Sequence, residues 1–369
     1  MQPLPQYARD LFNKHQSEYK SSGNKGLMFD RFYDAYNEDY SVDNKEKTTP
    51  LSTLAGSCGN NDQLANACGR RIQMVSQLQG QFGVFKTDWQ FVTGMGNSNP
   101  TENGFSWHPV LGTPYLPGSS VKGLLRAWME SWAFDQNQQQ ERDALVLEWF
   151  GGNKSADNHD GKAGDLIFFD AIPIDCPSVG VDIITPHMGD WYKQGGERIT
   201  ADSTPGDWHT PIPVSFLVTK EARFLFSIAP RVPGEYDLAK QAMECLKDAL
   251  AWLGAGGKTA AGYGHMSYDE NDSQQCFERQ RLANMSEAQH VMDRIERQLA
   301  SDEKSNRPEP GGSCKGALRA AIEQAEAWPK ADRDALKVLT EKVLAFHDGV
   351  KWKKKDKAKA LYQRILELC

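Results

Sequence analysis

The alternation of apolar and polar residues becomes regular at Gln81. The apolar positions that follow are Phe82, Val84, Trp89, Phe91 and Val92. Their spacing predicts one long strand with a possible bulge. A glycine-rich loop, Gly94–Gly104, comes next.

A helix is predicted after this loop, ending near Trp132. Pro114 and Pro117 keep the approach to it extended, and Ser119 or Ser120 supplies an N-cap. Apolar residues then recur at the spacing of one helix face, at Val121, Leu124, Leu125, Trp128 and Trp132.

Four further elements complete a domain. They are a buried strand at Gly164–Ile174, a strand pair within Val214–Ile228 around Lys220-Glu221, a helix at Glu235–Leu253 closed by Gly254, and a short strand at His265–Tyr268. The order is β-α-β-β-α-β, which predicts an α+β, ferredoxin-like (RRM-like) domain over residues 81–275. The connection between the middle strands, Asp175–Thr210, is unusually long, which is typical of a functional segment.

The two ends of the chain differ from this domain. Residues 1–80 give a weak pattern, with a possible helix at Tyr7–Tyr19 and a polar, loose stretch at Ser41–Pro50, and are expected to pack on the core. Residues 276–369 predict an all-α bundle, because 28 of the 32 glycines precede residue 275. Its expected helices are Phe277–Ala300, Cys314–Trp328, Asp332–His347 and Lys351–Leu368, with Ser301–Ser313 as a linker and a lysine run opening the last helix.

The net charge also differs between the two parts of the chain. The chain carries a net charge of −7, residues 1–274 a net of −11 and residues 275–369 a net of +4. Binding of nucleic acid through bulk charge is therefore excluded for the larger part. Any RNA contact there must use local features, such as backbone amides and helix termini.

Cysteines and the chain's start indicate the compartment. The seven cysteines are scattered and form no C-x-x-C pair, so neither a disulfide framework nor a zinc knuckle is predicted. The N-terminus lacks the pattern of a signal peptide, and no apolar stretch is long enough to span a bilayer. We expect a cytoplasmic protein without membrane contact.

The first candidate site is the start of the helix at Gly118. A helix N-terminus presents free N–H groups and partial positive charge, so it can bind a phosphate. The hydroxyls of Ser119 and Ser120 would complete such a site together with Lys122 and Arg126. On spacing alone, an ordinary capped helix with a solvated basic face explains the same residues.

The second is Gly254–Gly264, which holds five glycines in eleven residues, and Lys258. Such a loop lets backbone amides approach a polyanion. It is not a Walker A loop, because Trp252 stands where a glycine is required and no helix follows. A plain helix-to-strand turn would need one glycine, so ligand contact is favoured.

The third lies within Asp182–Pro211, where Met188, Trp191 and Tyr192 are more apolar than an idle loop requires. They could stack on bases or wedge between them. Local packing among themselves explains them equally well. His108, His187, His209 and His265 lie near these loops without a nucleophile or metal pattern, although a pair of His187 with Asp190 is conceivable.

Six segments together resemble the RAMP superfamily of CRISPR proteins, and within it the sixth-subunit family of the type III-B Cmr effector complex. They are FVTGMG (91–96), HPVLGTPYLPGSSVKGLLR (108–126), GDLIFFDAIP (164–173), DIITPHMGDWY (182–192), PIPVSFLVT (211–219) and GAGGKTAAGYG (254–264). The resemblance covers residues 81–268, with a weaker echo at Asn24–Tyr33, and does not reach residues 276–369.

The resemblance implies a non-catalytic subunit that grips the guide RNA (crRNA) near its 3′ end and caps a filament of backbone subunits in antiviral defence. Its partners would be crRNA, target RNA paired with the guide, backbone RAMP subunits and the small helical subunit. Neither a cofactor nor a metal is implied. The implied RNA contacts are Ser119, Ser120, Lys122, Arg126, Gly256, Gly257, Lys258, Thr259, Gly262 and Tyr263. A base-displacing thumb would come from Met188, Trp191 and Tyr192.

Two other functions stay open. Related filament subunits cut target RNA with an aspartate in the loop after the first strand, whereas Gly94–Gly104 holds Glu102 and no aspartate. This departure favours a non-catalytic role, although a glutamate could bind a metal in an endoribonuclease that cuts target RNA or processes the guide. A structural adaptor without RNA contact would suit the acidic charge of residues 1–274.

Overall fold

The structure is a computed structural model. It describes all residues except 1–3, 16, 19–22, 34–35, 40, 43–47, 153–160, 195–203, 205, 207, 233, 306–312 and 350, and the side chains of residues 136, 190, 193, 194 and 313. The chain divides into two units, Met1–Cys276 and Phe277–Cys369.

The central sheet of the first unit has the strand order β3-β7-β2-β8, and β4 also pairs with β7. The strands are β2 (Gln81–Thr87), β3 (Leu166–Phe168), β4 (Ile172–Pro173), β7 (Arg223–Pro230) and β8 (Met266–Tyr268). All pairs are antiparallel, and Phe85 of β2 lies opposite Phe224 on one side and Tyr268 on the other. If β3 and β4, which both pair with β7, are counted as one interrupted strand, a helix follows the first and the third strand of this sheet. This is the ferredoxin-like arrangement, and the α+β prediction is confirmed.

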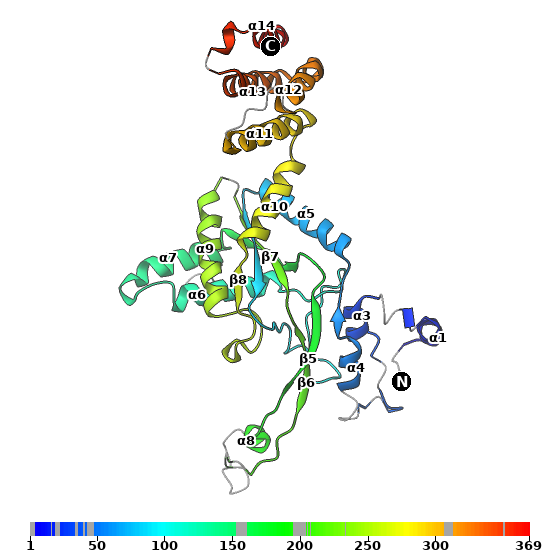
Figure 1. The fold of residues 1–369 in the computed structure, drawn as a ribbon. Coiled ribbons are helices and arrows are strands. Elements are labelled where there is room, and N and C mark those ends of the chain that lie inside the picture. Colours follow the sequence, from blue (N-terminus) through cyan, green and yellow to red (C-terminus); the bar gives the residue numbers. More distant parts are fainter. Residues whose placement is uncertain are drawn as a thin grey trace. The chain divides into compact units, whose positions relative to one another are not determined.

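Successive residues of the strands face opposite sides of this sheet, so each face needs a cover. Helices α6 (Gly118–Ser131) and α9 (Tyr236–Trp252) cover the face of Phe85 and Phe226 (Figure 1). On the other face, α5 (Asn61–Gln77) packs against Val84 and Leu225. The core therefore lies on both sides of the sheet.

A second sheet has the order β1-β5-β6 and contains β1 (Gly56–Ser57), β5 (Ser178–Ile184) and β6 (Val214–Thr219). Strands β5 and β6 extend away from the central sheet as a two-stranded arm, with α8 (Gly189–Gln194) near its far end (Figure 1). The arm corrects two predictions. The long connection contains a strand, and β6 pairs with β5 instead of forming a hairpin with β7.

The strand that begins at Gln81 is shorter than predicted. It ends at Thr87, and Phe91 then exchanges two backbone hydrogen bonds of 2.8 Å with Thr219 of the second sheet. Residues 88–90 thus form a turn that carries the chain from one sheet to the other. Because Trp89 lies in this turn and not in a strand, its side chain is 51% exposed.

The remaining helices of the first unit are α1 (Gln6–Lys14), α3 (Lys25–Asp30), α4 (Thr48–Thr53) and α7 (Gln139–Phe150), preceded by a 3₁₀ turn at Gln136–Gln138. Phe29 and Leu51 of this set join Trp107 in a separate buried cluster. Helix α1 ends before the predicted Tyr19, which lies outside the described residues. Within the stretch predicted to be loose, residues 43–47 also lie outside them, and α4 begins at Thr48.

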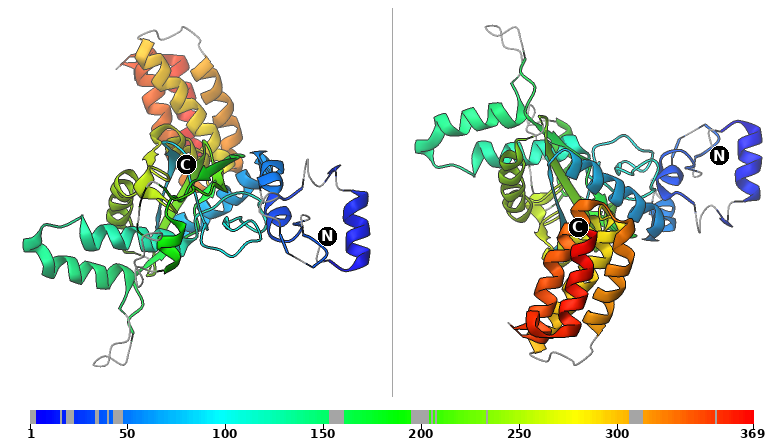
Figure 2. Two further views of the ribbon diagram at one scale, coloured as in Figure 1. Left: turned by 90° about the horizontal axis from the view of Figure 1, so that it is seen from below. Right: turned by 90° about the horizontal axis from the view of Figure 1, so that it is seen from above.

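The second unit is a bundle of α11 (Glu287–Ser305), α12 (Ser313–Gln324), α13 (Lys330–Asp348) and α14 (Asp356–Leu368), with 3₁₀ turns at Ala325–Ala327 and Trp352–Lys354. Figure 2 shows these helices lying side by side. Leu318, Leu336, Val343 and Ile365 lie in their shared core. None of the described helices is both long and apolar enough to cross a membrane.

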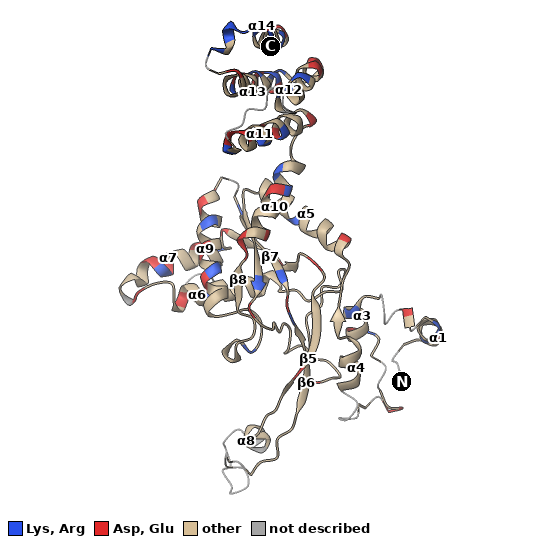
Figure 3. Cartoon of the chain, viewed as in Figure 1, with Lys and Arg blue, Asp and Glu red and all other residues tan. Residues whose placement is uncertain are grey.

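Three predicted boundaries in this part were wrong. The helix predicted at 277–300 is two helices, because α10 (Glu270–Ala283) ends and Ser286 caps α11 through a 3.1 Å bond from the Gln289 amide. Helix α11 continues to Ser305, into the predicted linker. Most of the lysine run precedes α14 in the turn around buried Trp352, so Asp356 and not a lysine begins the helix (Figure 3).

Candidate nucleic-acid interface

The glycine loop (Gly254–Gly264) is hydrogen-bonded to the segment that connects the two sheets. The Ala255 amide donates to the Gly264 carbonyl at 2.8 Å and closes the neck of the loop. The Gly257 and Gly264 amides donate, also at 2.8 Å, to the carbonyls of Val92 and Gln90. A 3₁₀ turn, η3 (Thr259–Ala261), forms the outer part. Backbone hydrogen bonds therefore hold the inner side of the loop in place.

Its two central glycines differ in their surroundings. Gly256 has φ +83°, and a Cβ there would lie 2.0 Å from the Val92 carbonyl oxygen. A Cβ on Gly257 would find only ordinary contacts, the nearest at 3.7 Å. However, the Gly257 amide already donates to Val92, so it is not available for the phosphate contact predicted from the sequence. An RNA contact at Gly257 stays a prediction, but it would not use this amide.

Tyr263 was also predicted to contact RNA, but its side chain is 6% exposed. Its hydroxyl donates to Asp182 Oδ2 of β5 at 2.7 Å, and its ring lies 6.1 Å from that of Phe216 of β6. The tyrosine therefore ties the glycine loop to the base of the arm, while the RNA contact expected at this residue stays a prediction. We assign it a positioning role.

Tyr263 also gives a pH-dependent expectation. Burial and the hydrogen bond to Asp182 raise the pKa of Tyr263 to about 12. An unfolded tyrosine has a pKa of about 10, so above that pH the folded state holds a proton that the unfolded state has lost. Stability contributed by this hydroxyl is therefore complete below pH 10 and is lost as the pH rises toward 12. Urea unfolding should show the advantage of the wild-type chain over Tyr263→Phe shrinking across that interval; a constant difference would contradict it.

Trp89 is a candidate that sequence reasoning missed, because its apolar spacing placed it in a strand. Its ring centroid lies 4.7 Å from that of Tyr263, tilted by 43°, and about half of the side chain is exposed. Lys258 of the glycine loop adopts a left-handed backbone conformation, and its Nζ lies 5.4 Å from the Phe216 ring centroid. The exposed indole thus packs on Tyr263, whereas the ammonium group of Lys258 lies over Phe216, the neighbour of that tyrosine. In the sequence, the polar neighbours Asp88 and Gln90 were the signal that Trp89 lies outside a strand.

The start of α6 is organised differently from the prediction. Pro117, not a serine, is the N-cap, and the Gly118 amide donates to Asp170 Oδ1 at 2.7 Å. A carboxylate therefore already satisfies part of the helix N-terminus. Ser119 and Ser120 are exposed in the first turn.

The basic residues of α6 face partly into solvent. Arg126 Nε pairs with Glu130 at 2.7 Å, which offsets its charge. Lys122 is half-buried and has no ion pair among the described residues. This helix start makes its described polar contacts with Asp170, and not with the glycine loop.

The arm presents apolar side chains to solvent. Tyr192 of α8 is 71% exposed, whereas Met188 and Trp191 are half-buried. Trp208, after the segment that the structure does not describe, is 65% exposed and stacks on His209. The predicted partner of His187, the side chain of Asp190, lies outside the described residues.

The other histidines hold loops together. His108 Nδ1 accepts from the amides of Val110 and Leu111 at 3.3 and 3.2 Å, and burial lowers its pKa. His265 Nδ1 lies 2.9 Å from the Ala251 carbonyl oxygen, at the neck of the glycine loop. His209 Nε2 lies 2.9 Å from the Thr204 carbonyl oxygen. Each of these three histidines contacts backbone atoms, which suits a structural role.

Glu102 is exposed at φ +77° in the loop Gly94–Gly104. Among the described residues, it belongs to no group of three or more His, Cys, Asp or Glu side chains placed to hold a metal ion. The one such group lies in the second unit.

Of the three predicted sites, the structure joins two, the glycine loop and the arm, through Tyr263 and Asp182. A loop with a lysine and exposed aromatic rings nearby are suited to a single-stranded nucleic acid, since phosphates and bases need those two partners.

The sequence is similar to proteins of one known family. The RAMP superfamily model matches residues 84–267. The CRISPR system Cmr subunit Cmr6 of Pyrococcus furiosus is 30% identical over 241 residues, which cover 52% of this chain and 69% of that protein.

Two solved structures are similar in part. A chain of the type III-B Cmr-beta complex bound to cognate target RNA is 18% identical, with a TM-score of 0.44, over 70% of this chain and 87% of that chain. The crystal structure of Cmr6 from Pyrococcus furiosus is 26% identical, with a TM-score of 0.31, over 52% and 98%. By the superfamily match and the sequence relative, this chain belongs to the RAMP superfamily, in the family of the Cmr6 subunit.

Proposed function

We propose that this chain is a subunit of a type III-B CRISPR effector complex that binds the guide RNA and does not cut RNA. It holds the guide near its 3′ end and caps the filament of related backbone subunits. Membership of the Cmr6 family supports the complex. The observation that supports RNA contact is the exposed Trp89 packed against Tyr263 of the glycine loop, which also contains Lys258.

Exposed Trp89 and half-buried Lys258 bind different parts of an RNA strand. Lys258 supplies a positive charge for a phosphate, and Gly262, Gly256 and Thr259 let the strand approach the loop backbone closely. The Trp89 ring offers a face on which a base stacks, a contact worth about 1–3 kcal/mol. Such local contacts allow RNA binding although residues 1–274 have a net charge of −11.

The other predicted contacts extend the path of the guide. Lys122, with the exposed hydroxyls of Ser119 and Ser120, binds a second phosphate, while Arg126 stays partly neutralised by Glu130. Tyr192 at the end of the arm displaces a nucleotide, supported by Met188 and Trp191. Target RNA pairs with the guide held in this way, and backbone RAMP subunits and the small helical subunit pack alongside.

Guide binding tests this proposal. Trp89→Ala and Lys258→Ala are expected to weaken binding of a guide-like single-stranded RNA to the full chain, the tryptophan change by about tenfold. The lysine change should also flatten the salt dependence of the affinity by roughly one charge. Filter binding over a salt series measures both, and guide retention in the assembled complex repeats the comparison.

Matched controls are Trp132→Ala, which removes another exposed indole, and Lys240→Ala, which removes an exposed lysine of α9. Both should bind RNA as the wild-type chain does. If the site variants bind as tightly as these controls, the chain is a structural adaptor and the glycine loop is a plain turn.

A second experiment tests the non-catalytic role against the endoribonuclease alternative. Glu102 is the acidic residue of the loop Gly94–Gly104, where catalytic relatives carry an aspartate. Glu102→Gln, made in the assembled complex, should leave every target cleavage site and its rate unchanged, with Glu141→Gln on exposed α7 as the control. Loss of cleavage at one position in the first variant alone would establish this chain as a nuclease.

A further inference from the structure

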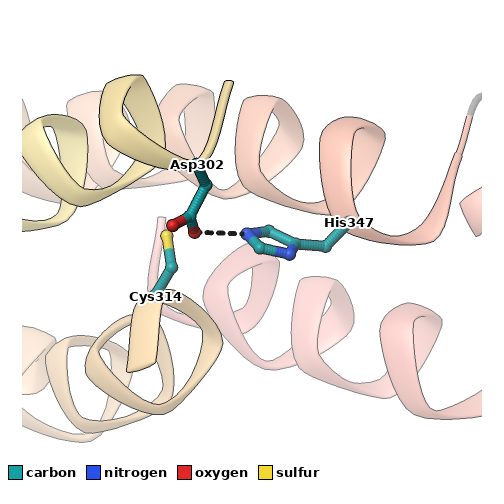
Figure 4. A group of neighbouring side chains, drawn as sticks. All are labelled: Asp302, Cys314 and His347. Atoms are coloured by element: carbon teal, nitrogen blue, oxygen red, sulfur yellow. Dashed lines mark ion pairs between the residues drawn. The ribbon is translucent and has the colours of Figure 1, made fainter. Parts of the chain in front are cut away.

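Three metal-binding side chains converge inside the second unit (Figure 4). They are Asp302 of α11, Cys314 of α12 and His347 of α13, and one ligand atom of each lies within 4.8 Å of the others. Cys314 is fully buried and the imidazole of His347 is 1% exposed. The cluster is therefore an interior feature of the bundle.

The buried imidazole of His347 indicates that this cluster binds a ligand. Both of its ring nitrogens are buried and neither has a hydrogen-bond partner among the described residues. Its Nε2 points at Asp302 Oδ2 from 3.4 Å, without hydrogen-bond geometry (Figure 4). Buried polar groups in proteins are almost always satisfied, so two orphaned nitrogens on one ring indicate a missing partner.

We propose that Asp302, Cys314 and His347 bind a zinc ion that braces α11, α12 and α13. Zn²⁺ takes nitrogen and oxygen ligands at about 2.0–2.1 Å in tetrahedral geometry, which places those two atoms roughly 3.3–3.4 Å apart. The observed separation of Nε2 and Oδ2 is 3.4 Å. A sulfur ligand at about 2.3 Å would lie roughly 3.6 Å from each. The Cys314 sulfur lies within 4.8 Å of both atoms, so it needs to close by at most about 1.2 Å and to give up its 3.9 Å contact with the Ile295 carbonyl oxygen.

The donor set selects the metal class. One thiolate and one imidazole favour a thiophilic d-block cation such as Zn²⁺ and disfavour Mg²⁺ and Ca²⁺, which prefer oxygen ligands. A fourth position remains for water. Around the ligands, Gln298 Nε2 donates to Asp302 Oδ1 at 2.9 Å, leaving Oδ2 for the metal. Such outer contacts orient ligands in metal sites.

The position of the site suggests what it does. Asp302 and Cys314 lie on either side of residues 306–312, and His347 stands near the end of α13. One ion would thus join two helices that are consecutive in the chain to a third. This inference stands independently of RNA binding, since all three ligands belong to the second unit.

The test uses the full chain purified with Zn²⁺ and dialysed free of excess metal. Elemental analysis should find about one zinc per chain, and saturating Zn²⁺ should raise the temperature of unfolding of the apo protein. Asp302→Asn, Cys314→Ser and His347→Asn should each lower zinc affinity by more than about 100-fold, the upper end of what outer-shell changes cost. Cys369→Ser and His290→Asn, both exposed and in the same unit, are the controls and should bind as the wild type.

Cobalt substitution keeps the test decisive if a ligand variant does not fold. Co²⁺ bound to the wild-type chain should give the thiolate-to-cobalt charge-transfer absorption of a Cys ligand, and Cys369→Ser should keep it. Absence of that band in the folded wild-type chain, or less than stoichiometric zinc, would overturn the proposal and leave Asp302 and His347 as a buried ion pair.

Discussion

Gly256→Ala is expected to lower the free energy of unfolding of the first unit by about 3 kcal/mol. A residue with a side chain is strained at φ +83°, and its Cβ would lie 2.0 Å from the Val92 carbonyl oxygen. The glycine loop must therefore move away from Val92. Gly257→Ala is the matched control, because its Cβ finds 3.7 Å of room and its backbone is not left-handed. Urea unfolding should show an effect below about 1 kcal/mol for the control.

The same pair of variants separates two uses of the loop. If the seated loop carries the guide, Gly256→Ala should lose guide RNA while Gly257→Ala retains it. Equal destabilisation by both substitutions would mean that the loop does not rest on Val92 as described. Equal loss of RNA with unequal stability would instead point to a phosphate at Gly257.

Tyr263→Ala is expected to cost about 3–4 kcal/mol of stability, as large-to-small changes of buried aromatic residues do. The change leaves a cavity between Trp89 and Phe216 and removes the tie to Asp182. Tyr263→Phe keeps the packing and loses only the hydrogen bond, for about 1 kcal/mol. Thermal or urea unfolding separates the two contributions, and exposed Tyr236→Ala should change little.

Guide affinity distinguishes a positioning tyrosine from a direct contact. With Trp89 and Lys258 still present, Tyr263→Phe should bind RNA nearly as well as the wild type, whereas Tyr263→Ala should weaken it because the indole loses its support. A loss in Tyr263→Phe as large as in Tyr263→Ala would show that the hydroxyl itself binds the guide.

The family resemblance predicted that the glycine loop and the arm contact RNA, and periodicity located the ferredoxin-like strands and helices. Neither could assign roles inside the loop. Gly257 and Tyr263 both belong to the motif that predicted a ligand-binding loop. In the structure, however, the Gly257 amide and the Tyr263 ring hold the loop against the rest of the unit. Which groups face inward depends on Gln90 and Val92, residues far away in the sequence.

The zinc cluster illustrates the same limit. Metal motifs are recognised in sequences when ligands share one helix or one knuckle, whereas Asp302, Cys314 and His347 come from three helices. Cysteine spacing alone therefore predicted no site. Only helix packing brings the three side chains within reach of one ion.

The sequence by itself determined the fold class, the order of the core elements, the division of charge and glycine near residue 275, and the family, because periodicity, composition and motifs are properties of neighbouring residues. Tertiary structure alone decided that β6 pairs with β5, that Trp89 is exposed and Tyr263 buried, and that Asp170 occupies the start of α6. These depend on contacts between segments 50 or more residues apart in most cases. Such contacts are selected by packing and hydrogen-bond satisfaction in the whole unit, which no local pattern encodes.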